Sequence, residues 1–116
     1  MKIINAPAFM IAQNPMTQKQ LFIVHVGIPY VMAEVHSFRA SDHLSINECE
    51  SKISVGSKTT VNGNTAVLDA VLILPNKKFS ELSSQTQADK LASLMRRMAD
   101  WYHAYLKWQE DQKREE

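Results

Sequence analysis

Two histidines and a glutamate lie close together in the sequence and are the residue types of a metal site. His25 precedes a turn signal at Gly27-Ile28-Pro29, and Glu34 and His36 follow it. Imidazole nitrogens and a carboxylate are ligands that zinc and iron accept. If the flanking segments pair as a hairpin, all three side chains share a face, but His25 lies opposite Met32 and only diagonal to Glu34. We therefore predict no metal and no cofactor, and keep as an alternative a small metal-binding protein or enzyme built on these residues.

The sequence offers no convincing nucleophile. Cys49 lies between Glu48 and Glu50, whose carboxylates raise the pKa of a thiol and disfavour the reactive thiolate. Serine, histidine and aspartate are all present, but no G-x-S-x-G turn presents a serine. The chain has three glycines, too few and too scattered to form a phosphate-binding loop. We therefore predict no catalytic residue, and the chain is not expected to be an enzyme.

Aromatic residues are concentrated near the C-terminal end. Four of the chain's nine aromatic residues fall within eight positions: Trp101, Tyr102, Tyr105 and Trp108. Tryptophan and tyrosine are enriched in protein interfaces, although such a segment can also be the core face of a helix. The protein-binding residues that we predict are Trp101, Tyr105, Lys107 and Trp108. With Arg96, Arg97 and Lys107 nearby, the segment also resembles a surface on which nucleic-acid bases stack.

The composition limits which partners and which cellular compartment we expect. The 13 Lys+Arg against 12 Asp+Glu give a net charge of +1, which does not favour nucleic acid or an anionic membrane. One cysteine excludes an intramolecular disulfide, and no stretch approaches the ~20 apolar residues that span a bilayer. The first residues resemble a signal peptide only weakly, because Asn5 and Pro7 interrupt their apolar run. We expect a cytoplasmic chain without a membrane partner.

The segment 20–38 predicts a first β-hairpin around Gly27-Ile28-Pro29. Its hydrophobic pattern favours the register that places Val26 opposite Val31, because a slip by one residue would bring Glu34 onto the apolar face. This register predicts a core face without polar residues: Phe22, Val24, Val26, Val31, Ala33 and Val35. The histidine and glutamate side chains would then lie on the opposite face.

A second hairpin is centred on Asn62-Gly63, a dipeptide typical of a type I′ turn because both residues accept positive φ. Its second strand, over 66–74, is apolar on both faces except for Asp69, which predicts a central strand covered on both sides. Residues 2–11 are expected to form an edge strand broken by Pro7. Residues 39–52 fit a strand or a helix equally well.

From about Ser84 the hydrophobic period becomes helical, and Ser84-x-x-Gln87 reads as a capping box. The predicted helix covers 84–112, and the polar tail over 109–116 is expected to fray. At ~1.5 Å per residue this helix is ~43 Å long, whereas the body of a domain of this size is roughly 35 Å across. The helix end with Tyr105 and Trp108 is therefore predicted to overhang the sheet and to form a homodimer.

These observations predict one domain over 1–116, of the α+β class. An antiparallel sheet or partly closed barrel of five to six strands occupies 1–75, followed by one long C-terminal amphipathic helix. The predicted function is that of a small regulatory, non-enzymatic protein-interaction factor, such as an inhibitor, an immunity protein, a chaperone or an assembly factor. The alternative is a nucleic-acid-binding module that uses the sheet face or the edge formed by Arg96, Arg97 and Lys107.

Overall fold

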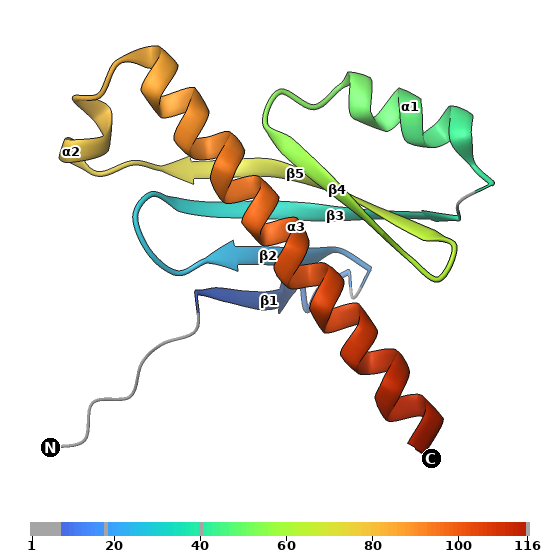
Figure 1. Ribbon diagram of the computed structural model, residues 1–116. Coiled ribbons are helices and arrows are strands. Elements are labelled where there is room, and N and C mark those ends of the chain that lie inside the picture. Colours follow the sequence, from blue (N-terminus) through green and yellow to red (C-terminus); the bar gives the residue numbers. More distant parts are fainter. Residues whose placement is uncertain (1–7, 18, 40, 116) are drawn as a thin grey trace, which may run out of the picture.

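The computed structural model describes residues 8–17, 19–39 and 41–115, which form one antiparallel sheet crossed by a long helix (Figure 1). The five strands lie in the order β1-β2-β3-β5-β4. Their bounds are Phe9–Gln13 (β1), Leu21–His25 (β2), Tyr30–Arg39 (β3), Gly56–Val61 (β4) and Asn64–Leu74 (β5). The helices are His43–Ser51 (α1), Lys77–Ser80 (α2) and Ser84–Glu115 (α3). The predicted α+β class is confirmed, and the sheet is open rather than a partly closed barrel.

The β4–β5 hairpin forms as predicted. Asn62 and Gly63 have φ angles of 51° and 78°, so both central residues of the turn lie in the left-handed region that a type I′ turn requires. Val61 pairs with Asn64 directly beside the turn. The local Asn-Gly signal was therefore sufficient to determine this register.

The β2–β3 hairpin differs from the prediction by one residue. His25, not Val26, lies opposite Val31. A shift of one residue turns a whole strand over, so Ile23 faces α3 and Val24 faces away from it. The predicted register avoided polar groups in the core, but one ring nitrogen of His25 has a hydrogen-bond partner there. Its Nδ1 atom hydrogen-bonds to the carbonyl oxygen of Pro29 at 2.8 Å, within the hairpin loop itself.

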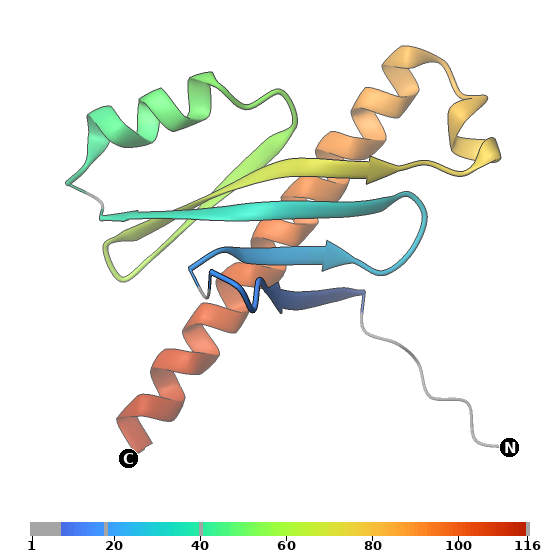
Figure 2. The same ribbon diagram turned by 180° about the vertical axis from the view of Figure 1, so that it is seen from behind.

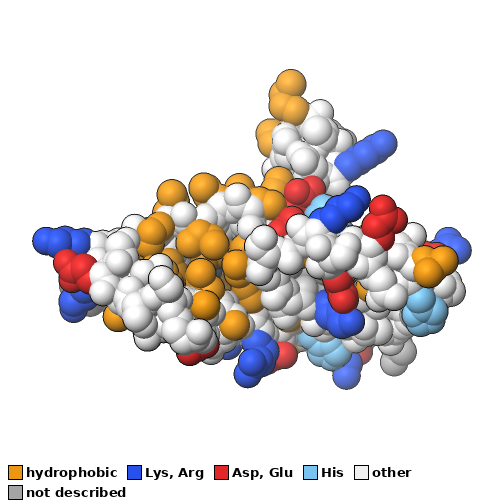
Figure 3. Space-filling model, turned by 90° about the horizontal axis from the view of Figure 1, so that it is seen from above, with side chains coloured by type: hydrophobic (Ala, Val, Ile, Leu, Met, Phe, Trp, Pro, Cys, Tyr) orange, Lys and Arg blue, Asp and Glu red, His pale blue; other side chains and the backbone are white. Residues whose placement is uncertain are grey.

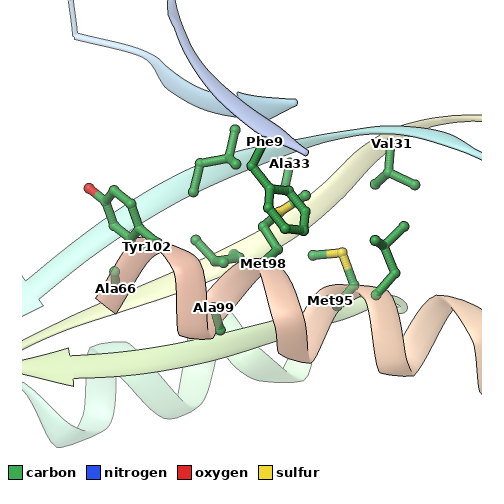
Figure 4. Close-up of a cluster of buried hydrophobic side chains, with 11 residues drawn as sticks. Phe9, Val31, Ala33, Ala66, Met95, Met98, Ala99 and Tyr102 are labelled. Atoms are coloured by element: carbon green, nitrogen blue, oxygen red, sulfur yellow. The ribbon is translucent and has the colours of Figure 1, made fainter. Parts of the chain in front are cut away.

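The main core lies between one face of the sheet and α3 (Figure 4). The buried residues of this cluster are Phe9, Ile23, Val31, Ala33, Ala66, Leu68, Leu94, Met95, Met98, Ala99 and Tyr102. The helical residues among them recur at intervals of three and four, which places them on one face of α3. The stripe predicted from the sequence therefore covers the sheet, with Met95 and Met98 fully buried at its centre.

α3 begins at Ser84, as predicted, but ends three residues later than predicted. The hydroxyl of Ser83 accepts a hydrogen bond from the amide of Thr86 at 3.1 Å, so the N-cap is Ser83 rather than Ser84. At the other end the helix continues to Glu115, past the predicted end at 112 and through the tail that was expected to fray. This tail lacks glycine and proline and is rich in strong helix formers, which favours the extension.

The second half of β5 departs from the predicted arrangement. Ala33 pairs with Ala70 and Met32 with Leu72, so Val71 forms a bulge without a partner in β3. Beyond the bulge, Leu72 and Leu74 face away from α3. The prediction of a strand covered on both sides holds for its buried first half but is wrong here, because β4 pairs only as far as Asp69 and both leucines are exposed.

The two segments with weaker sequence signals are now placed. Residues 39–52 contain the helix α1, and the carboxylate of Asp42 accepts a hydrogen bond from the amide of Arg39 at 3.2 Å just before it. The described part of the predicted N-terminal strand is the edge strand β1, while its beginning, with Pro7, lies outside the described residues. Within 8–17, 19–39 and 41–115, no helix has the length and apolar character needed to cross a membrane.

Candidate functional site

The structure does not assemble the histidine and glutamate side chains that resembled a metal site. His25 lies on the face of the sheet covered by α3, and Glu34 and His36 lie on the other face, as the pairings of β2 with β3 require. Among the residues that the structure describes, no group of three side chains of metal-binding type comes together. The alternative built on His25, Glu34 and His36 therefore loses its geometric basis.

The sheet face turned away from α3 carries a continuous apolar surface, which we call the open apolar face. Its residues are Met10, Val24, Tyr30, Met32, Leu72 and Leu74. Four of them form a single row across the sheet, because Met10 pairs with Val24, Val24 with Met32, and Met32 with Leu72. In Figure 2 α3 passes behind the strands and no helix crosses in front of them. Met10, Tyr30, Leu72 and Leu74 are 44–53% exposed, so this surface is open to solvent.

A free strand edge adjoins the open apolar face. The amide of Ala70 donates to the carbonyl of Val55 at 2.9 Å, close to where β4 begins. From there on, 72–74 pair with β3 on one side and Val71 lies in the bulge, and the described strands offer 71–74 no neighbour on the other side. We call 71–74 the free β5 edge. It contains no charged residue, and hydrophobic side chains gather over this part of the molecule, between its α2 and α1 ends (Figure 3).

Carboxylates border the open apolar face on the side of α1. Glu34 lies directly opposite Asp69, one row further along the sheet than Met32 and Leu72. Asp69 also lines a small cavity between the sheet and α1, together with Cys49. Burial raises the pKa of the Cys49 thiol, and the nearby carboxylates of Asp69 and Glu50 raise it further. The upward shift of the Cys49 pKa that the sequence predicts is confirmed, although burial contributes more to it than the carboxylates do.

The thiol of Cys49 is expected to react slowly with iodoacetamide. Because the thiolate is the reactive form, a raised pKa lowers its population at pH 8, and the rate should continue to rise above the ordinary thiol pKa of about 8.5. The measurement is the alkylation rate between pH 7 and pH 10 by mass spectrometry. The urea-unfolded chain provides the control and should react faster at pH 8. A folded protein whose rate reaches its plateau below pH 8.5 would contradict the assignment.

The aromatic residues near the C-terminal end form a stacked series along α3. Trp101 packs against Phe9 with ring centroids 5.7 Å apart, and Tyr105 stacks between Trp101 at 5.9 Å and Trp108 at 6.2 Å. Trp101 and Tyr105 are partly buried against the core, whereas Trp108 is 57% exposed. The end of α3 extends beyond the sheet, as predicted (Figure 1). Of the four predicted protein-binding residues, Lys107 and Trp108 are thus the accessible ones.

The basic residues of α3 do not form one continuous patch. Arg96 and Lys107 are eleven residues apart, close to three full turns, and lie on the same side of the helix. Arg97 instead lines a groove beside α2. The nucleic-acid alternative stays a prediction, and a neutral overall charge gives it little electrostatic support.

The open apolar face was missed by the sequence analysis because β2 was turned over. Both faces of β2 are apolar, with Leu21 and Ile23 on one and Phe22 and Val24 on the other, so apolar alternation alone could not choose between them. In comparisons with family models, curated proteins and solved structures, the chain matched none of them.

Proposed function

We propose that this protein acts by binding another protein through the open apolar face and the free β5 edge. The observation that supports the proposal is the uninterrupted row of Met10, Val24, Met32 and Leu72, which ends at the free β5 edge. Contiguous exposed apolar patches usually mark interfaces, and proteins normally protect long apolar strand edges with charges, proline or a covering element. Such a factor needs no catalytic residue, since it works by occupying the surface of its partner.

The geometry favours strand addition as the binding mode. An extended segment of the partner would pair its backbone with 71–74, and alternate side chains of that segment would lie beside Leu72 and Leu74. The carboxylates of Glu34 and Asp69 border this surface, so a Lys or Arg in the partner would be favoured there. We therefore infer a partner segment that is apolar, extended and flanked by a basic residue.

Selection from a random peptide library displayed on phage tests this proposal. The selected peptides should combine alternating apolar residues with a flanking Lys or Arg. Their affinity should fall at least tenfold in Leu72→Glu, which puts a charge on the open apolar face. Leu44→Glu is the matched control, because Leu44 is 87% exposed on α1 and outside that face, and it should bind normally. Glu34→Lys should shift the preference towards acidic peptides. No enrichment, or equal loss in both glutamate variants, would contradict the proposal.

For the overhanging end of α3 we propose a second copy of the chain as the partner. Lys107 and Asp111 form no ion pair with each other in the described chain, although they are four residues apart. In an antiparallel pair of helices whose two-fold axis crosses α3 at the level of residue 109, Lys107 of each copy meets Asp111 of the other. The exposed ring of Trp108 lies next to the same axis, so one two-fold contact covers both the apolar and the charged groups.

Sedimentation velocity at micromolar concentration tests the self-association. The wild type is expected to sediment as a dimer and Trp108→Ala as a monomer. Leu44→Ala removes a hydrophobic side chain elsewhere that is even more exposed than Trp108, and this variant should stay dimeric. A monomeric wild type would contradict the dimer and leave the proposal for the open apolar face standing.

A further inference from the structure

A groove of about 880 Å³ lies on the α3 side of the sheet, apart from the open apolar face. Its walls come from the β2–β3 loop, from α2 with the segment that follows it, and from the first half of α3. Grooves of ~300–1,000 Å³ with apolar walls and a few convergent polar groups are typical of small-molecule sites. We call it the basic groove, for the charges described next.

Cations outnumber anions around the basic groove. Lys78, Lys90 and Arg97 line it, and none of the three has an ion-pair partner among the residues that the structure describes. The carboxylate of Glu81 also lines the groove but is 4.0 Å from the ammonium group of Lys77, which partly neutralises it. The groove therefore has a positive potential and would attract an anion.

A buried imidazole adds a second polar feature to the basic groove. His25 is only 8% exposed and lines its inner end. Because a carbonyl oxygen can only accept, the hydrogen bond to Pro29 requires the proton of the neutral ring to be on Nδ1. Nε2 is then an acceptor without a partner in the described chain. It lies beside Gly27, where a Cβ atom would approach it to 3.2 Å, so the absence of a side chain at this position keeps it accessible.

Apart from Asn76 and Ser93, the remaining side chains that line the basic groove are apolar. They are those of Ile28, Pro29, Phe79, Leu82 and Leu94. Ile28 is 60% exposed although it is a large hydrophobic residue, so an apolar ligand in contact with it would remove that surface from water. Phe79 is held in place by the short helix α2, whose N-cap Asn76 accepts a hydrogen bond from the amide of Phe79 at 2.9 Å.

We propose that the basic groove binds a small amphiphilic anion, a carboxylate or phosphate group on an apolar chain. Its anionic group lies among Lys78, Lys90 and Arg97, and its chain contacts Ile28 and the apolar wall. Where the headgroup is a phosphate monoanion, Nε2 of His25 accepts a hydrogen bond from its protonated oxygen, whereas a carboxylate has no such hydrogen and is held by the cations alone. This inference does not depend on the proposed protein binding, because the two surfaces lie on opposite faces of the sheet.

Isothermal titration with octanoate, octyl phosphate and octanol tests the proposal. Saturable binding of one or both anions is expected, with octanol at least tenfold weaker, and the tighter anion identifies the preferred headgroup. The His25 ring nitrogen signals in NMR spectra should shift with octyl phosphate, whose monoanion carries the hydrogen that Nε2 accepts, and less with octanoate, which carries none. If octanol binds as tightly as the anions, or if neither anion binds, the proposal is overturned.

Two double variants, each of which removes two positive charges, distinguish binding in the basic groove from a general attraction of anions to the helix. Lys90→Gln/Arg97→Gln removes two cations of the groove and should weaken the anion at least tenfold. Arg96→Gln/Lys113→Gln removes two exposed cations of the same helix outside the groove and should leave the affinity unchanged. Equal weakening in both variants overturns the proposal. Binding to vesicles of phosphatidylcholine with phosphatidylglycerol, without saturable binding of either small anion, would overturn it in favour of a membrane surface.

Discussion

Ile23→Asp is expected to abolish folding. Ile23 is fully buried between the sheet and α3, where a carboxylate finds neither water nor a cationic partner. The loss of the apolar side chain alone would cost ~2–5 kcal/mol, and burial of the charge adds to it. Since domains of this size have a total stability of ~5–15 kcal/mol, little or no folded protein should remain. Circular dichroism and yield of soluble protein measure the effect.

Val24→Asp is the matched control for this prediction. Val24 is adjacent in the same strand but faces away from α3, on the open apolar face, where its carboxylate would stay in contact with water. This variant is expected to fold, with a urea midpoint close to that of the wild type. If Val24→Asp fails to fold and Ile23→Asp stays folded, the register predicted from the hydrophobic pattern is correct and the observed one is wrong.

Elements with strong local signals could be predicted from the sequence. Asn62-Gly63 determined the second hairpin, since few other residues accept two consecutive positive φ angles. The long helical stripe determined α3 and its overhang. The first hairpin was predicted but its register was not, because both faces of β2 are apolar and the group that decides between them, the ring of His25, is polar. A histidine on the core face looked unfavourable until its hydrogen bond to Pro29 was known.

The candidate sites were less predictable than the fold, because they depend on which parts of the sheet no helix or strand covers. The free β5 edge exists because β4 begins only at Gly56, opposite Asp69, and this limit is not visible as a pattern in β5 itself. The exposure of Trp108 could be predicted, because the expected helix is longer than a domain of this size is wide. Lys78 and Arg97 come together only through the fold, from α2 and α3, and no sequence spacing links them.

Gly56→Ala is expected to destabilise the protein strongly. A Cβ atom at this position would overlap the backbone carbonyl oxygen of Leu68 and would lie 2.6 Å from Cγ2 of Ile53. The Leu68 carbonyl belongs to the buried half of β5 and cannot move without disturbing the pairing with β4, so the cost should reach ~2–3 kcal/mol. The midpoint of urea unfolding measures it.

Gly63→Ala separates this steric cost from a general effect of replacing glycine in the same hairpin. A Cβ atom at Gly63 meets nothing within 4 Å, so its only cost is the positive φ of 78°, which amounts to ~1 kcal/mol. The two variants make the same chemical change at the two ends of β4. Gly56→Ala should therefore have the lower urea midpoint. Equal midpoints would mean that β4 approaches β5 less closely at Gly56 than the structure shows, and the free β5 edge beside it would then begin at a different residue.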